Sequence, residues 1–487
     1  MPIEQSQITW AVEAFGDTSL PDYPTLRSYY QGNHNLSFAT PKFNQTFGTL
    51  FKSFAYNRCR TVVDSLANGL RVSGFSINGI DVGNLALMEE PGGEGNDLSQ
   101  KAWTLWKLGN MPLREGELYV EAGITGDAFG VVWFDADPPL GTGLPRIWPN
   151  RAEIMRVQFD DDGRITLAAK SWMITAKGED EKKRRLTFYT PTEIVKLITT
   201  GKSESGLKKN LGDYELVQEV NLLGQPMENP ILHNLGAVPV VHYPNNAPMV
   251  GERGISELKD VVPLQDALNK AIADMLVAME YSAFPQRWAT GIETPEEDED
   301  GNPIVPWKPG PGNVWYSSED GAKFGDFTVG DLSKFLDVQN QFDMDISRVS
   351  GIPVHYLMMN GNFPSGEALK TAESPFTAKK QDRQNSYGNG HSQAMLLQFK
   401  MLGISDPLLI ETQWEPAEPR VQGDLITQGL QMVQAGLPVE IAAKHMGLDE
   451  QDLLALQAAS EEQNASRATA IEQIASEQMT QQLIPEG

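Results

Sequence analysis

Two short stretches of the sequence carry residue types that could do chemistry. Residues 201–203 (GKS) resemble the end of a phosphate-binding loop, in which backbone amides and a lysine hold the phosphates of a nucleotide. That motif also requires a glycine at position 196, where this chain has Lys196. Residues 298–303 (DEDGNP) begin like a calcium-binding loop, but Pro303 and Pro309 stand where the turn glycine and the bidentate glutamate belong. We therefore exclude a nucleotide loop and interpret the second stretch as a solvated acidic loop.

The other side chains of catalytic or metal-binding type are scattered. The six histidines form no His-Glu-x-x-His pair, no Gly-x-Ser-x-Gly motif occurs, and the single cysteine is Cys59. His233 and His242 flank a predicted strand and could each meet a carboxylate, which is weak evidence for a metal. Cys59 lies in a helical pattern, which favours a buried structural thiol over a nucleophile. The sequence therefore predicts a protein without catalytic residues, metal or cofactor.

The elements that would position functional groups change character along the chain. Residues 1–56 are polar and aromatic with turn chemistry, and helical spacing follows around 57–70 and 98–122. Between 124 and 245 strand patterns dominate, and Asp162-Gly163 predicts a tight hairpin turn. At 487 residues, two to four domains or subdomains are expected. We predict an α+β fold whose strands are mostly antiparallel.

Two helical patterns frame a short insert after residue 251. Apolar residues three or four apart over 251–284 predict a helix of about 28 residues, with Pro263 marking a kink or a late start. Residues 331–350 predict a second helix, and residues 285–330 between them revert to short strands and turns. The apolar stripes of the two helices would suit an ordinary buried helix as well as contact with another subunit. Their members are Leu258, Val262, Leu268, Ile272, Met275, Met279, Phe335, Phe342 and Ile346.

Further helical stretches follow toward the C-terminus. One covers 365–402 and is expected to be interrupted at Pro375 and at the Gly388-Asn389-Gly390 turn. A returning strand is expected at 411–419, and the last 67 residues are almost wholly helical in pattern.

The loop between the second and third helical stretches is unusually apolar. Residues 351–364 read GIPVHYLMMNGNFP, with glycines that could serve as hinges and prolines that limit them. From these residues alone two interpretations are equally good. The loop could pack as part of a core, or it could present apolar side chains to a partner.

The charge balance limits the protein's contacts with nucleic acid. Lys and Arg total 39 against 65 Asp and Glu, a net charge of −26. This argues against a protein that grips phosphates with basic side chains, but not against one that lets nucleic acid slide past an acidic wall. Solubility alone also explains the acidity. No apolar run approaches the ~18 residues needed to cross a bilayer, so no membrane contact is predicted.

The chain resembles the portal proteins of tailed bacteriophages, specifically the branch found in phages with long non-contractile tails. Residues 231–285, from ILHNLGAVPVVHYPNN to AMEYSAFP, carry the most specific similarity. Shorter matches follow the family's order: YYQGNH (29–34), NRCRTVVDSLANGLRVSGF (57–75), GITGDAFGVVW (123–133) and SGEALKTAES (365–374). The resemblance covers almost the whole chain.

The resemblance implies a portal-type fold of several subdomains. A mixed α/β wing would comprise 1–250. A long helix and strand would cover 365–420, and their residues 376–420 would return to the wing. The stem would be helices 251–284 and 331–350, with a small α/β clip at 285–330 between them. The tunnel loop would be 351–364, and a helical crown would comprise 421–487.

The resemblance also implies a function and partners. About twelve copies would form a ring at one capsid vertex, assembled in the host cytoplasm and retained in the virion. Double-stranded DNA would pass through it during packaging and ejection, without sequence specificity. The ring would dock the terminase large subunit and a head-completion or tail adaptor protein, next to the major capsid and scaffold proteins. Alternatives are another ring-forming head–tail connector, which would be far shorter, or a hydrolase whose α/β half holds an unrecognised site.

Two sets of residues acquire roles from the resemblance. The tunnel-loop residues that would line the DNA channel are His355, Tyr356, Leu357, Met358, Met359, Asn360, Asn362 and Phe363. The clip residues that could dock the motor or the adaptor are Glu296, Glu297, Asp298, Glu299 and Asp300. A solvated hairpin tip explains this acidic run equally well.

Overall fold

The computed structural model describes most of the chain. The described residues are 3–34, 55–81, 86–87, 94–136, 138, 141–175, 182–203, 206–219, 226–249, 251–283, 287–291, 321–326, 331–358, 366–404, 408–418, 431–436 and 442. The chain divides into two compact units, Met1–Ala417 and Glu418–Gly487. All elements named below belong to the first unit. The predicted crown, 421–487, lies mostly outside the described residues.

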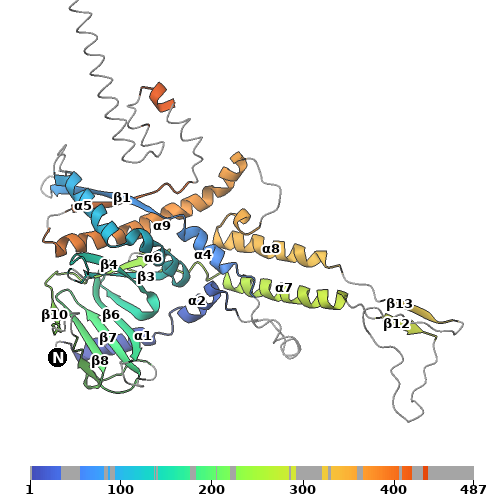
Figure 1. The fold of residues 1–487 in the computed structure, drawn as a ribbon, viewed down its shortest axis with the longest axis horizontal. Coiled ribbons are helices and arrows are strands. Elements are labelled where there is room, and N and C mark those ends of the chain that lie inside the picture. Colours follow the sequence, from blue (N-terminus) through green and yellow to red (C-terminus); the bar gives the residue numbers. More distant parts are fainter. Residues whose placement is uncertain are drawn as a thin grey trace, which may run out of the picture. The chain divides into compact units, whose positions relative to one another are not determined.

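Helices supply the elements around which the first unit is built (Figure 1). Within the described ranges they are α1 (Gln5–Gly16), α2 (Tyr23–Gln31), α4 (Cys59–Ala67), α5 (Glu94–Leu108), α6 (Met111–Thr125), α7 (Val262–Ala283), α8 (Ser333–Ser350) and α9 (Gly366–Met401). The described residues also form three short 3-10 turns: η1 (Ala152–Ile154), η2 (Leu211–Asp213) and η3 (Val354–Tyr356).

The strands form antiparallel sheets. Their bounds are β1 (Val72–Asp81), β2 (Ala86–Leu87), β3 (Asp127–Phe134), β4 (Pro145–Arg151), β5 (Met155–Phe159), β6 (Ile165–Thr175), β7 (Lys182–Tyr189), β8 (Glu193–Thr199), β9 (Tyr214–Leu216), β10 (Ile231–Leu232), β11 (Val240–Pro244), β12 (Arg287–Thr290), β13 (Lys323–Asp326) and β14 (Leu408–Trp414). The strand orders are β14-β1-β2, β11-β3-β4, β12-β13, and β10-β8-β7-β6-β5 with β9 paired to β8. Every pairing between described strands is antiparallel. The α+β class is thereby confirmed.

The hairpin predicted from Asp162-Gly163 is also confirmed. It joins β5 to β6, and Gly163 adopts a left-handed φ of +76°, which glycine tolerates at little cost. The Asp160 side chain accepts hydrogen bonds from the backbone amides of Asp162 and Arg164 at 3.1 and 2.7 Å, which closes the turn.

A large core unites segments far apart in the sequence. It brings α5, α6, β1, β3 and β11 together with α9 and β14, so residues of 67–243 and 387–410 bury each other. Among its fully buried aromatic side chains are Trp106, Tyr119 and Tyr387. Figure 1 shows α9 lying across these strands. A returning strand was predicted at 411–419; the observed strand β14 begins three residues earlier, ends at Trp414 and pairs with β1.

The N-terminal segment differs from the sequence prediction. Residues 1–56 carry turn signals, yet they include the helices α1 and α2. Asp22 is the N-cap of α2 and accepts a hydrogen bond from the Thr25 amide at 3.2 Å, while Pro24 lies in the first turn. Gly32 ends this helix in a left-handed conformation. Capping residues and turn residues are of the same types, so a short helix can look like a pair of turns.

The first helix after residue 251 is shorter than predicted. It has 22 residues and begins at Val262, so Pro263 occupies the first turn, where the missing amide costs no hydrogen bond. Residues 251–261, called the crossing segment below, are instead turns and irregular backbone that hydrogen-bond to the end of α6, the start of β3 and the residue after β11. The Gly254 amide donates to Asp127 there, and the Ile255 amide donates to the Asn245 carbonyl. The late helix start is the correct alternative.

The long helix α9 is continuous, which corrects the interruptions predicted at Pro375 and 388–390. Its 36 residues include Pro375. A Cβ on Gly388 would lie 3.1 Å from Nε1 of Trp414, and one on Gly390 would lie 2.7 Å from the ring of Tyr243. The glycines therefore let β14 and β11 approach the helix closely, and they do not form a turn.

Candidate functional site

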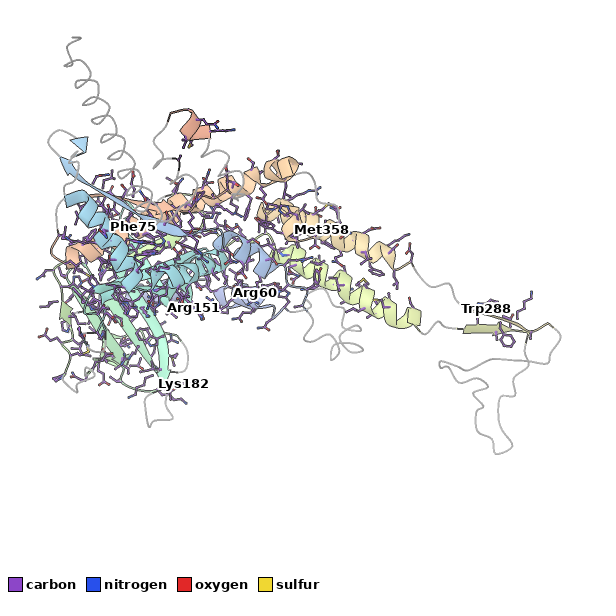
Figure 2. The ribbon with its side chains drawn as sticks, turned by 45° about the horizontal axis from the view of Figure 1, so that its top comes forward. Arg60, Phe75, Arg151, Lys182, Trp288 and Met358 are labelled. Atoms are coloured by element: carbon purple, nitrogen blue, oxygen red, sulfur yellow. The ribbon has the colours of Figure 1, made fainter. Side chains whose placement is uncertain are left out.

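The candidate site is the junction at which α7, α8, the loop after α8 and α9 meet. Figure 1 shows α7 and α8 side by side, and Met358 marks the junction in Figure 2. One hydrophobic cluster, called the junction core below, joins these elements to α2 and α4. Its buried residues include Cys59, Val62, Leu258, Leu268, Ile272, Ile346, Ile352, Leu357 and Phe376.

Most of the predicted stem residues belong to this core. Leu258, Leu268, Ile272 and Ile346 are buried in it, and Val262, Met275 and Phe342 pack against it. Leu258 lies in the crossing segment before α7, not in the helix. Two residues differ: Phe335 is only half-buried, and Met279 keeps 47% of its surface exposed. The apolar residues of the two helices are therefore buried near the junction, whereas Met279, toward the C-terminal end of α7, is exposed.

The described part of the predicted tunnel loop is anchored to α9 and to the junction core. Leu357 is 4% exposed, and Met358 packs against the core. Nε2 of His355 lies 3.1 Å from a carboxylate oxygen of Glu373, and the ring of Tyr356 meets that of Phe376 edge to face. Tyr356 is 37% exposed. The remaining loop residues of the prediction, Met359, Asn360, Asn362 and Phe363, lie outside the described residues.

Four polar residues, called the elbow cluster below, fasten the segment before α7 and the end of α8 to α9. They are Asn245, Glu257, Lys379 and Arg383. The Lys379 ammonium contacts a Glu257 oxygen and donates to the carbonyl of Ser350, the last residue of α8, at 2.7 Å. Arg383 donates to the other Glu257 oxygen at 2.8 Å and to Asn245 at 2.6 Å. One lysine of α9 thus holds the segment entering α7 and the end of α8.

The electrostatics of the elbow cluster favour the charged form of Glu257. Burial by itself raises the pKa of this carboxyl, but the adjacent Lys379 and Arg383 charges outweigh burial, so the pKa lies below its usual value. The carboxylate side chain is 6% exposed. Because Glu257, Lys379 and Arg383 are largely removed from water, losing one partner of these ion pairs costs much of the protein's stability.

A second buried ion pair ties α8 to the segment before α4. Asp343, 1% exposed, accepts two hydrogen bonds from Arg58, at 2.8 Å from Nε and 2.7 Å from Nη2. Asp343 lies on the same helix face as Ile346 and Ser350, which are also buried. Neither the elbow cluster nor this pair was identified from the sequence. A charged residue within an apolar helical stripe was the available signal at position 343.

The described residues contain a buried chain of acid–base groups and no candidate metal cluster. No set of three or more His, Cys, Asp or Glu side chains able to hold a metal ion comes together within the described ranges. Glu115, Tyr119 and His391 form a hydrogen-bonded chain, with Tyr119 Oη 3.3 Å from Glu115 and 2.8 Å from His391 Nε2. All three are buried, so a substrate cannot reach them. Burial lowers the pKa of His391 to about 3 and raises that of Glu115 to about 7.

The individual residues singled out for chemistry have ordinary structural contacts. Cys59 is buried as predicted, and burial raises the pKa of its thiol to about 12. His242 meets a carboxylate, Asp127, at 2.6 Å. Ser203 is buried, and its amide donates to the Lys182 carbonyl. The acidic run Glu296 to Asp300 lies outside the described residues.

The described helices include no candidate for a membrane span, since none combines sufficient length with sufficient hydropathy.

Comparisons with known proteins agree on one family. The sequence profile of the family described as "Phage portal protein, SPP1 Gp6-like" matches residues 12–478. The portal protein of Mycobacterium phage D29 is 25% identical over 412 residues, covering 80% of this chain and 75% of that protein. The portal protein of Mycobacterium phage L5 is 24% identical over 454 residues, covering 90% and 84%.

A solved structure titled "Virion of native gene transfer agent (GTA) particle" also aligns with the chain. The TM-score is 0.44 at 11% identity, and the alignment covers 91% of this chain and 99% of that one. The family profile spans nearly the entire sequence, including every element of the junction. The chain therefore belongs to the SPP1 Gp6-like family of phage portal proteins.

Proposed function

We propose that this chain forms a ring of about twelve copies at one vertex of a phage capsid, and that double-stranded DNA passes along its axis during packaging and ejection. The observation that carries the proposal is the match of the portal family across residues 12–478. Phage portal proteins are virion components. In the proposal the ring also docks the terminase large subunit and the tail adaptor, and it contacts the major capsid and scaffold proteins during assembly in the host cytoplasm.

The proposal assigns a part of the ring to each segment of the chain. The wing is 1–250 with 376–420, the stem is 251–284 with 331–350, the clip is 285–330, the tunnel loop is 351–364 and the crown is 421–487. The elbow cluster and the junction core then lie where wing, stem and tunnel loop meet.

Exposed apolar residues on the two stem helices support subunit contact. Met279 of α7 and Leu336, Val338 and Val349 of α8 keep between 42% and 53% of their surfaces exposed in a single chain. Exposed apolar side chains that gather on one element can mark a surface that another subunit covers. In the proposed ring the stem helices of the neighbouring subunits cover them.

The proposed DNA channel uses the loop's exposed residues, while its buried residues act as anchors. Leu357 and Ile352 are buried in the junction core, and His355 is held by Glu373, so this half of the loop is tied down. Tyr356 faces outward and, with Met359, Asn360, Asn362 and Phe363, is proposed to meet DNA. Uncharged side chains of this kind do not exchange counterions with phosphates, so the duplex can slide past them.

We further propose that the protein is not an enzyme. The portal family is structural, and translocation energy would come from the separate terminase motor. The chain of Glu115, Tyr119 and His391 is closed to solvent and offers no alternative site.

Cryo-electron microscopy of the purified protein tests the ring. Class averages are expected to show about twelve copies around an axial hole that is narrowest at residues 351–364. A particle mass of about 640 kDa, twelve times the chain mass of 53.7 kDa, should accompany them in native mass spectrometry. Monomers that persist at high concentration and with scaffold protein present would contradict the proposal.

A pair of substitutions at Tyr356 tests the channel. In a packaging reaction with the cognate motor, Tyr356→Arg is expected to slow DNA entry because twelve guanidinium groups would bind the phosphates. Tyr356→Phe keeps the ring contact with Phe376 and should package at the wild-type rate. Equal rates for both variants would remove Tyr356 from the proposed channel.

A further inference from the structure

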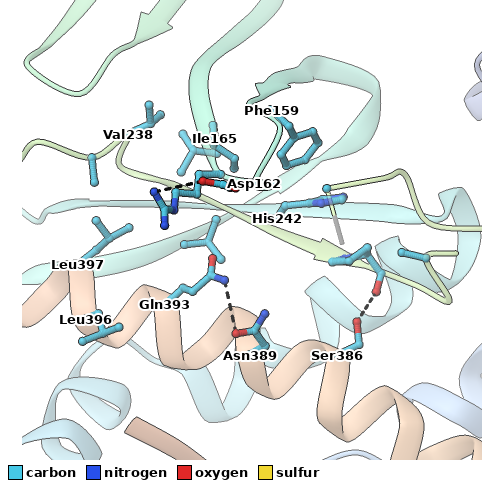
Figure 3. A pocket seen from close by; sticks show the side chains of 18 of the residues that line it. Phe159, Asp162, Ile165, Val238, His242, Ser386, Asn389, Gln393, Leu396 and Leu397 are labelled. Carbon is cyan, nitrogen blue, oxygen red and sulfur yellow. Dashed lines mark hydrogen bonds and ion pairs between the residues drawn. The ribbon is translucent and has the colours of Figure 1, made fainter. Parts of the chain in front are cut away.

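A large groove lies in the predicted wing and begins beside the elbow cluster, since Arg383 lines it. Its volume is about 1050 Å³, and three elements form its walls: the edge strand β11, one face of α9 and the hairpin between β5 and β6. Figure 3 shows Ser386, Asn389, Gln393 and Leu396 of α9 on one side of it, with Phe159 and Ile165 on the other. The lining along α9 extends from Asp382 to Lys400, about 27 Å at 1.5 Å per residue.

The floor of the groove is the open edge of a sheet. The Val132 amide donates to the Pro239 carbonyl and the Asn245 amide donates to the Gly126 carbonyl, so odd-numbered residues of this segment bond to β3. The backbone amide and carbonyl of His242 therefore point to the opposite side, where no described strand pairs with β11. The Pro244 carbonyl accepts from Ser386, so only a short stretch of the edge is open.

Apolar side chains surround this open edge. Ile165, Val238, Leu397 and Ile404 line the groove, and Leu396 is 40% exposed within it. Met249 at the rim is 68% exposed. An open strand edge flanked by apolar side chains is the surface that accepts an added extended segment.

The charge of the groove differs from that of the chain. Its lining contains Asp162 and Asp382 together with Arg164, Arg383 and Lys400. Arg164 lies 3.8 Å from Asp162, and the buried Glu257 neutralises Arg383, so the groove is close to neutral. The chain as a whole has 65 acidic and 39 basic residues, so two copies repel each other over most of their surfaces. The groove is a place where a second acidic copy can approach without that repulsion.

We propose that this groove is a contact between subunits, occupied by an extended apolar segment of a second copy of the chain. The segment pairs with the backbone of His242 and places apolar side chains against Val238 and Leu397. The inference rests on the proposed ring, because the contacts of a ring are heterologous: each subunit offers one surface to the preceding copy and a different one to the next.

Site-specific cross-linking tests the contact. The native Cys59 is buried and its thiol pKa is about 12, so a thiol introduced by Leu396→Cys can be labelled selectively with a benzophenone maleimide. Leu402→Cys is the matched control, because Leu402 is also 40% exposed near the end of α9 but does not line the groove. Rings assembled from mixed ¹⁴N and ¹⁵N chains are irradiated, and cross-linked peptides are identified by mass spectrometry.

The contact predicts cross-links between ¹⁴N and ¹⁵N chains from the thiol of Leu396→Cys, several-fold more than from that of Leu402→Cys. As a second readout, unlabelled Leu396→Glu should lose ring assembly while Leu402→Glu retains it. Rings with no inter-chain cross-link from Leu396→Cys, and with intact assembly of Leu396→Glu, would overturn the groove contact and leave the ring proposal standing. Absence of rings from the wild-type chain would overturn both.

Discussion

The elbow cluster makes a quantitative prediction about how firmly the stem is held. Glu257→Gln preserves the size of the side chain but removes its charge, leaving Lys379 and Arg383 beside a neutral amide. Breaking a buried ion pair on one side costs about 3–5 kcal/mol, and the partial exposure of Lys379, 19%, favours the lower end. We therefore expect the free energy of local opening around the cluster to fall by about 3 kcal/mol, or roughly 100-fold in the opening equilibrium.

Hydrogen exchange measured by mass spectrometry reports this opening directly, since it resolves segments that open locally. Peptides covering 245–258 and 379–391 should exchange roughly 100-fold faster in Glu257→Gln, whereas peptides from β7 should not change. Arg348→Gln is the control, because it breaks the exposed pair with Asp345, which is worth about 0.5 kcal/mol. Equal effects of the two substitutions would refute the assignment of the elbow cluster as the fastening of the stem.

Three further predictions concern other parts of the fold. Gly254→Ala should destabilise the protein by more than about 3 kcal/mol, because its Cβ would lie 1.9 Å from the Gly126 carbonyl oxygen; Gly212→Ala, with open space around it, should be nearly neutral in the same denaturation assay. Burial lowers the pKa of His391 to about 3 in the native protein, whereas the pKa of a histidine in the unfolded chain is 6.5. As the pH falls below 6.5 the unfolded chain therefore takes up a proton that the native protein does not, and stability is lost. The wild-type advantage over His391→Gln in urea unfolding should therefore shrink by about 2 kcal/mol between pH 7 and pH 5, and parallel pH profiles would contradict this. Cys59 should react with a thiol reagent at pH 8 only after denaturant unfolds the chain; rapid labelling of the native protein would show that the thiol is not buried.

Periodicity predicted the elements that make long, regular contacts. The stripe of α8 and the strands of 124–245 appear where the pattern places them, because each buries one face and repeats with its own period. The returning strand β14 overlaps its predicted range only in part. The hairpin turn at Asp162-Gly163 was equally predictable, since a left-handed backbone position strongly favours glycine.

In the long helix α9, glycine and proline led to a wrong prediction of interruptions. Gly388 and Gly390 indicate a turn when only local propensity is considered. In the folded protein they lie against Trp414 and Tyr243, where no side chain fits. Their role depends on partners far away in the sequence, and a local pattern carries no information on such partners.

For this protein, the sequence by itself determined the α+β class, the family, the two helices around the insert and the burial of Cys59. These properties follow from periodicity, composition and motif order, which are properties of neighbouring residues. The tertiary structure decided which charges fasten the stem and where an open strand edge meets α9. It also decided that Leu357 is buried in the junction core while Tyr356 beside it is exposed. Glu257, Lys379 and Arg383 are spread over 127 positions of sequence, and only folding brings them within hydrogen-bond distance and removes the water that would weaken their attraction.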